Sequence, residues 1–287
     1  EVAIGSADVM YVTAHTACAS GLPINSWRST DGGQTWTKMP VELLDIYAAS
    51  PTLTYGTTCG GALKSTDSGT TWSDILPGSQ GENSDPYAIT GSPDGQSVYV
   101  AYASEGGTGS IRRSTDAGST WSDVTPKSVP PDGLLRAAVS MMFVTGFEGR
   151  PQDGGLYMAN GQGTFFLPTE TDAWQTHIDT VNAVDNPAYY LTAFYVDTAY
   201  SDDYAKSGPI LYAARAKLGE QALEGIGVFR SANLGATWQQ IGDDIGKLPV
   251  QGLILAPHDT TVDPTMQEAL IAATSSGAWG ILMAPLK

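Results

Sequence analysis

An eight-residue segment recurs along this chain of 287 residues and constrains its fold more than any other feature. The segment reads S-x-D-x-G-x-T-W at 29–36, 65–72 and 114–121, and a fourth copy at 231–238 has Asn in place of Asp. Asp followed two positions later by Gly, between two strand-like runs, is typical of a β-hairpin turn. We call this segment the box. The chain is therefore expected to repeat one strand–turn–strand unit several times.

Each residue type in the box has a structural task. The Asp carboxylate can accept N–H groups of its own turn, the Gly can adopt a positive φ, and the Trp ring can anchor the hairpin by becoming fully buried. We therefore expect structural roles, and neither catalysis nor calcium binding, for Asp31, Gly33, Trp36, Asp67, Gly69, Trp72, Asp116, Gly118, Trp121, Asn233, Gly235 and Trp238. Asn233 keeps one acceptor oxygen, so it is expected to hold its turn less completely.

The box resembles the Asp-box, or BNR repeat, of sialidases, xyloglucan-degrading hydrolases, sortilin-type receptors and photosystem-assembly propellers. The resemblance implies an all-β protein, a β-propeller whose blades carry the box between their third and fourth strands. The box tryptophans lie 36, 49 and 117 residues apart. The last gap is expected to hide a unit without a box, in which 155–160 precedes the missing turn and Trp174 follows it.

Three more strand-like runs follow, at 250–257, 269–274 and 279–285. Six units of about 48 residues match the size of propeller blades. We expect one domain over 1–287 with six four-stranded blades; seven blades and an extended solenoid remain alternatives. The last unit lacks a fourth strand, and segment 1–5 is expected to complete it unless the chain is a fragment of something larger.

Charge and cysteine content limit the partners and the compartment. The chain has 30 acidic and 14 basic residues, a formal charge of -16, which repels nucleic acid and anionic lipid. No apolar run reaches the roughly 18 residues of a membrane helix. The three histidines lack metal-ligand spacing, so we expect no metal and no cofactor. A low charge density and many Gly residues favour a secreted or periplasmic monomer.

The two cysteines, Cys18 and Cys59, are expected to form a disulfide. Both fall in loops that join the second and third strands of the first two units, so both come to the same end of their blades. In Asp-box families that end, opposite the boxes, binds the ligand. The longest such loops are expected at 146–155 and 214–227. They supply the candidate carboxylates for catalysis, Glu148 and Glu220, and the candidate ligand contacts Arg150, Asp153, Arg215 and Glu224.

Two functions remain open at this point. The first is a binding or scaffold module for a carbohydrate or protein ligand. The second is a glycoside hydrolase, sialidase-like or xyloglucanase-like, in which two carboxylates act across a cleft. The sequence has no Arg-Ile-Pro segment near its beginning and no nucleophile that a motif places, which favours the binding module.

Overall fold

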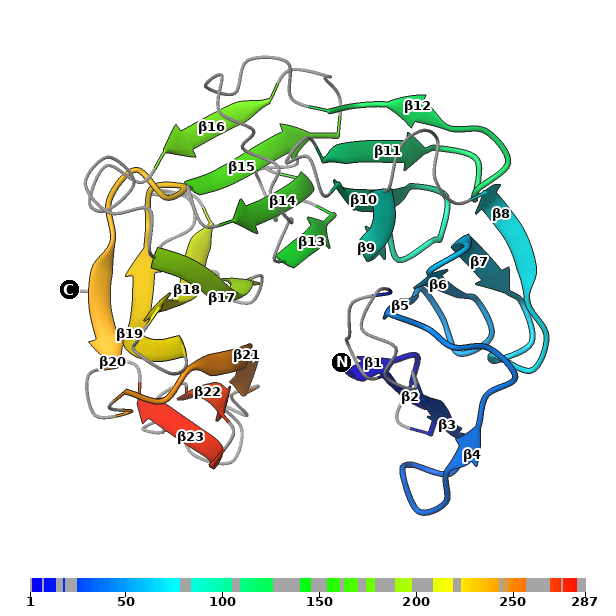
Figure 1. Ribbon diagram of the computed structural model, residues 1–287, viewed down its shortest axis with the longest axis horizontal. Helices are drawn as coiled ribbons and strands as arrows, with labels where there is room; N and C mark the ends of the chain where they lie inside the picture. The colour runs from blue at the N-terminus through cyan, green and yellow to red at the C-terminus, as the bar shows by residue number, and fades with distance from the viewer. Residues whose placement is uncertain are drawn as a thin grey trace. The chain divides into compact units, whose positions relative to one another are not determined.

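In the computed structural model most of the described residues form β-strands (Figure 1). The described residues are 2–6, 8–13, 18, 25–77, 84–104, 109–125, 140–145, 154–160, 163–169, 174–178, 189–197, 209–218, 223–242, 245, 247–256, 269–274 and 276–282. They contain 23 strands in six sheets, which confirms the all-β prediction. No helix within these ranges is long and apolar enough to cross a membrane. Contacts divide the chain into two compact units, 1–143 and 144–287, which are described separately.

The first unit holds three four-stranded sheets. The first sheet consists of β1 (Val2–Ile4), β2 (Met10–Thr13), β3 (Ser26–Ser29) and β4 (Thr37–Lys38). The second consists of β5 (Asp45–Ala48), β6 (Thr54–Thr58), β7 (Gly61–Ser65) and β8 (Ser73–Pro77). The third consists of β9 (Ser84–Gly91), β10 (Val98–Ser104), β11 (Ser110–Ser114) and β12 (Ser122–Asp123).

The remaining strands form three more sheets, the last with three strands. The fourth sheet consists of β13 (Ser140–Val144), β14 (Gly155–Asn160), β15 (Gly163–Pro168) and β16 (Gln175–Ile178). The fifth consists of β17 (Tyr189–Asp197), β18 (Ile210–Leu218), β19 (Leu223–Ser231) and β20 (Gln239–Gly242). The sixth consists of β21 (Val250–Ala256), β22 (Ala269–Thr274) and β23 (Gly277–Leu282).

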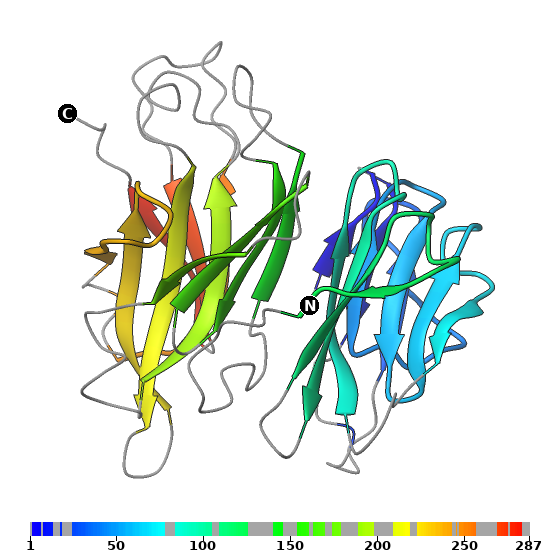
Figure 2. The same cartoon turned by 90° about the horizontal axis from the view of Figure 1, so that it is seen from above.

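Every sheet is a meander in which strands that follow one another in sequence lie side by side (Figure 2). Each box forms the turn between the third and fourth strands of its sheet, as predicted. The expectation that segment 1–5 completes the last sheet is wrong, because β1 pairs with β2. A tight turn causes this, since Gly5 N–H donates to the Val9 carbonyl at 2.9 Å and returns the chain alongside β1.

The prediction for the unit without a box is wrong by one strand. Segment 155–160 is β14, the second strand of its sheet, whereas a box follows a third strand. Asn160 pairs with Gly163, so the apolar run that follows, β15, is the true third strand. Trp174 does lie where expected, directly before β16, as each box Trp lies directly before a fourth strand.

The core is built on tyrosines that the sequence analysis did not single out. The second strands of the first five sheets each carry one Tyr that is at most 1% exposed: Tyr11, Tyr55, Tyr99, Tyr157 and Tyr212. Each is followed two positions later by Thr or Ala, a weak but repeated signal. Leu270 on β22 of the sixth sheet is also fully buried and packs in one cluster with Tyr212 of the fifth sheet.

Two of these tyrosines connect neighbouring sheets through their hydroxyl groups. The Thr54 hydroxyl of β6 donates to the Tyr11 hydroxyl at 3.0 Å, and the Tyr55 hydroxyl donates to the Gly95 carbonyl before β10 at 2.7 Å. Burial raises the pKa of Tyr55 to about 12. The tyrosines therefore pair their polar atoms within the protein while their rings fill the space between sheets.

The box tryptophans are less buried than expected. Trp36 is 39% exposed, and Trp72, Trp121 and Trp238 are half-buried. The indole N–H of Trp72 donates to the Gly69 carbonyl of its own turn at 3.1 Å, which holds the ring flat against the box. The ring thus covers the turn and leaves one side to solvent.

We predict that Tyr55→Ala lowers the free energy of unfolding by about 3–5 kcal/mol, as for other large core residues. Tyr55→Phe should cost about 1 kcal/mol, because it removes only the hydrogen bond to Gly95. Trp36→Ala serves as the comparison and should cost less than Tyr55→Ala. Urea denaturation of the three variants measures this, and a larger loss in Trp36→Ala would contradict the assignment.

Candidate functional site

The box carboxylates are fully used within their own turns. In the second box the Ser65 hydroxyl and the Thr71 N–H both donate to Asp67 Oδ1, at 2.8 Å each, and the Thr71 hydroxyl donates to Oδ2 at 2.6 Å. The Ser65 hydroxyl oxygen in turn accepts the Gly69 N–H at 2.8 Å. The boxes of Asp31 and Asp116 have the same bonds.

These bonds favour the charged carboxylate. Mainly because of the Thr hydroxyl and N–H groups that follow, the pKa values of Asp31, Asp67 and Asp116 are lowered to about 2. A carboxylate with such a pKa carries no proton near neutral pH and cannot act as a general acid. In these three boxes the carboxylate is hydrogen-bonded within its own turn.

The turn geometry requires glycine. In the second box Ser68 and Gly69 both have positive φ, 57° and 73°, and the Thr70 N–H donates to the Asp67 carbonyl at 3.3 Å. Two central residues with positive φ are the signature of a type I′ turn. A Cβ on Gly69 would also lie 3.0 Å from the Tyr11 ring of the preceding sheet. The box therefore rests against its neighbour.

A cation of the preceding sheet adds to this contact. Arg28 in β3 donates to the Ser68 carbonyl at 2.7 Å, and Lys64 in β7 donates to the Ala117 carbonyl of the next box at 3.1 Å. Both cations directly precede the Ser of their own box. The second and third boxes thus each receive the cation of the sheet before them.

The expectation for Asn233 is wrong. Its Oδ1 accepts the Ser231 hydroxyl and the Thr237 N–H at 2.9 Å each, and its Nδ2 donates to the Thr237 hydroxyl at 2.9 Å. The direction of one hydrogen bond reverses, since the Thr hydroxyl can accept as well as donate. The amide therefore holds the turn with the same set of contacts as the carboxylates.

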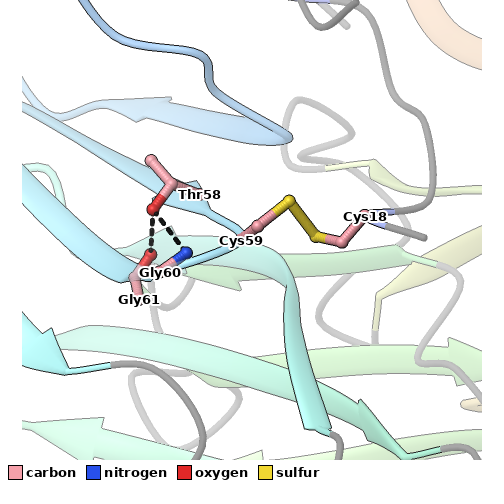
Figure 3. Close-up of a disulfide and its surroundings, with 5 residues drawn as sticks. All are labelled: Cys18, Thr58, Cys59, Gly60 and Gly61. Atoms are coloured by element: carbon pink, nitrogen blue, oxygen red, sulfur yellow. Dashed lines mark hydrogen bonds between the residues drawn. A yellow bond between two sulfur atoms is a disulfide. The ribbon is translucent and has the colours of Figure 1, made fainter. Parts of the chain in front are cut away.

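The opposite end of the sheets, where the second strand turns into the third, we call the turn end. There a disulfide joins Cys18, between β2 and β3, to Cys59, between β6 and β7 (Figure 3). The Cα atoms lie 5.6 Å apart, and the sequence separation is 41 residues. In the chain-entropy account, closing a loop of this size stabilises the fold by up to about 4 kcal/mol.

The turn that carries Cys59 has its own internal bonds. The Thr58 hydroxyl donates to the Gly61 carbonyl at 3.2 Å and accepts the Gly60 N–H at 3.1 Å (Figure 3). Thr274 makes the same two bonds to Gly277 and Ser276 in the turn between β22 and β23. Both turns are short and internally hydrogen-bonded. The turn of Cys59 therefore holds one end of the disulfide in a defined position.

The loop predicted at 146–155 has a different place in its sheet. It joins β13 to β14, the first and second strands, and so begins and ends at the same end of the sheet as the box turns. Its candidates Glu148, Arg150 and Asp153 lie outside the described residues. The prediction that this loop belongs to the turn end is wrong, because the unit was placed one strand out of register.

The loop predicted at 214–227 is largely strand. β18 and β19 pair from Leu211↔Ser231 to Leu218↔Leu223, so only 219–222 connects them, and Glu220 lies outside the described residues. Arg215 is on β18 and only 8% exposed. Its guanidinium lies 5.3 Å from the Phe229 ring centre and 5.8 Å from that of Trp238. Burial lowers the pKa of Arg215 to about 10, and it remains charged at neutral pH.

Glu224 is not assembled with Arg215. It lies on β19 opposite Lys217, with which it forms an ion pair at 3.7 Å, and a second ion pair joins it to Lys247 at 3.6 Å. The two described candidates therefore stabilise the β18–β19 hairpin. Within the described residues no group of three or more His, Cys, Asp or Glu could hold a metal ion.

Comparisons with solved structures agree with this arrangement of sheets. A GH74 enzyme from Niastella koreensis matches with a TM-score of 0.62 and 19% identity, over 97% of this chain and 44% of that chain. An ancestral GH74 enzyme matches with a TM-score of 0.67 and 15% identity, over 96% and 34%. YCF48 from Cyanidioschyzon merolae matches with a TM-score of 0.58 and 16% identity, over 98% and 79%.

The chain is a β-propeller. Its six sheets are the blades, in agreement with the predicted number. At these identities the likeness concerns the fold, and the chain spans less than half the length of either GH74 enzyme. No protein-family model and no curated protein matches the sequence.

We predict that replacing Asp31, Asp67 and Asp116 together by Asn makes the melting temperature fall less steeply as the pH is lowered. A carboxylate with a lowered pKa stabilises the fold fully above its ordinary value near 3.8, and this contribution is lost as the pH falls towards about 2. The amides should keep the turn bonds, as Asn233 does, without this loss. Melting temperatures between pH 7 and pH 2 measure the effect.

Two controls sharpen the comparison. Asp67→Ala removes the acceptors and should lower the melting temperature already at pH 7. Asp74→Asn changes an exposed carboxylate outside the box and should leave the pH profile as in the wild type. A melting temperature that falls as steeply with decreasing pH in the triple Asn variant as in the wild type would refute the claim that the box carboxylates stabilise the fold in their charged form.

Proposed function

We propose that this β-propeller is an exported module that binds a carbohydrate or protein ligand at its turn end. The observation that carries the proposal is the disulfide between the second-to-third-strand turns of blades one and two. A covalent bond between two surface turns restricts how far they can separate before any ligand arrives. Such preorganisation lowers the entropy cost of binding.

The disulfide also supports export. Structural disulfides persist in oxidising compartments and are rare where thiols are kept reduced. Cys59 lies exposed on its turn, so a reducing environment would have access to the bond. We therefore place the protein outside the cytoplasm, as a secreted or periplasmic protein.

The ends of the blades differ in what they can offer a ligand. At the box end, Asp, Ser and Thr side chains are hydrogen-bonded within their own turns. At the turn end, the described turns use only a threonine internally and leave the remainder of their sequence to vary. Variable loops on a rigid scaffold are the usual place for binding groups.

A glycoside hydrolase is the alternative, with Glu148 or Glu220 as a candidate carboxylate, although the loops that carry them begin at opposite ends of their sheets. It shares its fold with the two GH74 enzymes, but many functions occur on one fold. The box carboxylates, with pKa values of about 2, would not supply its acid. The binding module therefore stands first.

The test screens immobilised glycans and peptides for both binding and hydrolysis. It uses the wild type, a Cys18→Ser/Cys59→Ser double variant, Arg150→Ala and Glu148→Gln. We predict a ligand that the wild type binds without turnover and that the double Ser variant binds at least tenfold more weakly. Asp31→Asn, at the box end, is the matched control and should bind as the wild type does. Melting curves show that each variant is folded.

Two results would contradict the proposal. Ligand binding that is unchanged in the double Ser variant would remove the turn end as the binding site. Hydrolysis of a glycan that is lost in Glu148→Gln while binding persists would make the protein a glycoside hydrolase.

A further inference from the structure

The bond between Cys18 and Cys59 is accessible from outside the folded protein. Cys59 is exposed on its turn, and Cys18 is half-buried. They are the only two cysteines of the chain, so no other thiol of the protein can exchange with the bond. Exposed disulfides are the labile and regulatory ones, whereas buried ones resist reduction. The bond can therefore meet a reductant while the protein is folded.

The turn of Cys59 keeps its shape by bonds that do not involve sulfur. Strands β6 and β7 pair up to Thr58 and Gly61, which flank the turn. The Thr58 hydroxyl donates to the Gly61 carbonyl at 3.2 Å and accepts the Gly60 N–H at 3.1 Å (Figure 3). The turn after Thr274, between β22 and β23, has the same two bonds and no cysteine. This turn geometry does not require a disulfide.

Blades one and two are also joined by contacts that do not involve sulfur. Arg28 of β3 donates to the Ser68 carbonyl in the second box at 2.7 Å. The Thr54 hydroxyl of β6 donates to the Tyr11 hydroxyl of β2 at 3.0 Å. One buried apolar cluster takes its residues from both blades and the segment between them: Tyr11, Met39, Leu43, Ile46 and Leu63. We therefore expect the blades to stay packed when the disulfide opens.

The disulfide ties a long connection to a short one. The connection from β2 to β3 comprises residues 14–25 and contains Cys18, whereas residues 59 and 60 alone connect β6 to β7. Fixing a point within a connection costs more chain entropy the longer the connection is. The cross-link therefore restricts mainly the β2–β3 connection, and its opening releases that restriction at the turn end.

We propose that the disulfide is a redox switch of the turn end, which a dithiol reductant opens while blades one and two stay folded. A thiolate of the reductant attacks Sγ of the exposed Cys59, the sulfur–sulfur bond breaks, and Cys18 leaves as a thiolate that takes up a proton. The second thiolate of the reductant attacks the mixed disulfide and releases Cys59 as the second thiol. The reductant becomes a cyclic disulfide, and the protein gains two electrons and two protons.

The effect of the switch on ligand binding rests on the function proposed above. The closed form holds the two connections together at the turn end, and the open form loses this preorganisation. The tests of the switch use no ligand, so their outcome is independent of that of the binding screen.

The test treats the folded whole chain with dithiothreitol, which is a dithiol. Alkylation and mass spectrometry count the free thiols over time, in buffer and in urea below the unfolding transition. Hydrogen exchange of the Gly69 amide, which donates to the Ser65 hydroxyl at 2.8 Å in the second box, reports whether the blades stay folded. Brief digestion with proteinase K measures how fast the chain is cut within 14–25. The Cys18→Ser/Cys59→Ser double variant is the matched control.

We expect a reduction rate that is proportional to the dithiothreitol concentration and unchanged by urea, because the bond opens without global unfolding. Exchange of the Gly69 amide should be the same in the oxidised and the reduced protein. Cleavage within 14–25 should be about tenfold faster in the reduced protein, because the restriction is released. The double Ser variant should match the reduced protein with or without dithiothreitol.

Three results would overturn the proposal. A reduction rate that rises steeply with urea would show that the bond opens only when the protein unfolds. Faster exchange of the Gly69 amide in the reduced protein would show that the blades depend on the bond. Equal cleavage within 14–25 in the oxidised and the reduced protein would show that the bond does not restrict the turn end.

Discussion

A buried tyrosine on the second strand is the side chain on which the packing of the blades depends. The rings of Tyr11, Tyr55 and Tyr212 pack against the next sheet, and in blades one and two the hydroxyl is paired with the next blade. Each meander presents one apolar face to the next, and a sheet face of this kind is stable only when another element covers it. The tyrosine gives that packing a fixed register, because its hydroxyl must find a partner once water is excluded.

The box depends on the same packing. In the second box Gly69 approaches the Tyr11 ring of the preceding blade, and in the second and third boxes a turn carbonyl accepts a cation from the preceding blade. The box is thus both a hairpin turn and a contact between blades. These two roles engage its polar groups in hydrogen bonds. At the turn end a disulfide joins Cys18 and Cys59 of blades one and two.

The boxes could be predicted because their residues interact within one turn. The strand order of segment 155–160 and the place of Arg215 depend on residues distant in the sequence, so they could not. Asp67, Gly69 and Trp72 act within one turn, so their spacing alone reveals the hairpin. Segment 155–160 lacks a turn signature on the expected side, and its alternation of apolar residues suits any strand of a buried sheet. Charged residues between 214 and 227 suggested a loop. Arg215 is instead on a strand, where two aromatic rings cover it.

Burial was misjudged for a physical reason. Trp was expected to be fully buried because it has the largest apolar area, but it lies at the box turn, where the indole N–H of Trp72 bonds to Gly69 and that of Trp121 bonds to both Gly118 and Ile75 of the preceding blade. Tyr hydroxyls reach further, so the tyrosines occupy the space between blades. The candidate site was predicted less well than the fold, because loop length follows no periodicity, and four of its six residues lie outside the described ranges.

A double-mutant cycle between Tyr11 and Thr54 tests the account most directly. Tyr11→Phe and Thr54→Val each remove one hydroxyl of a hydrogen bond that joins blades one and two. The account predicts a coupling free energy of about 0.5–1.5 kcal/mol in the unfolding equilibrium, because the two groups are buried partners. A coupling free energy indistinguishable from zero would contradict the claim that these tyrosines fix one blade against the next.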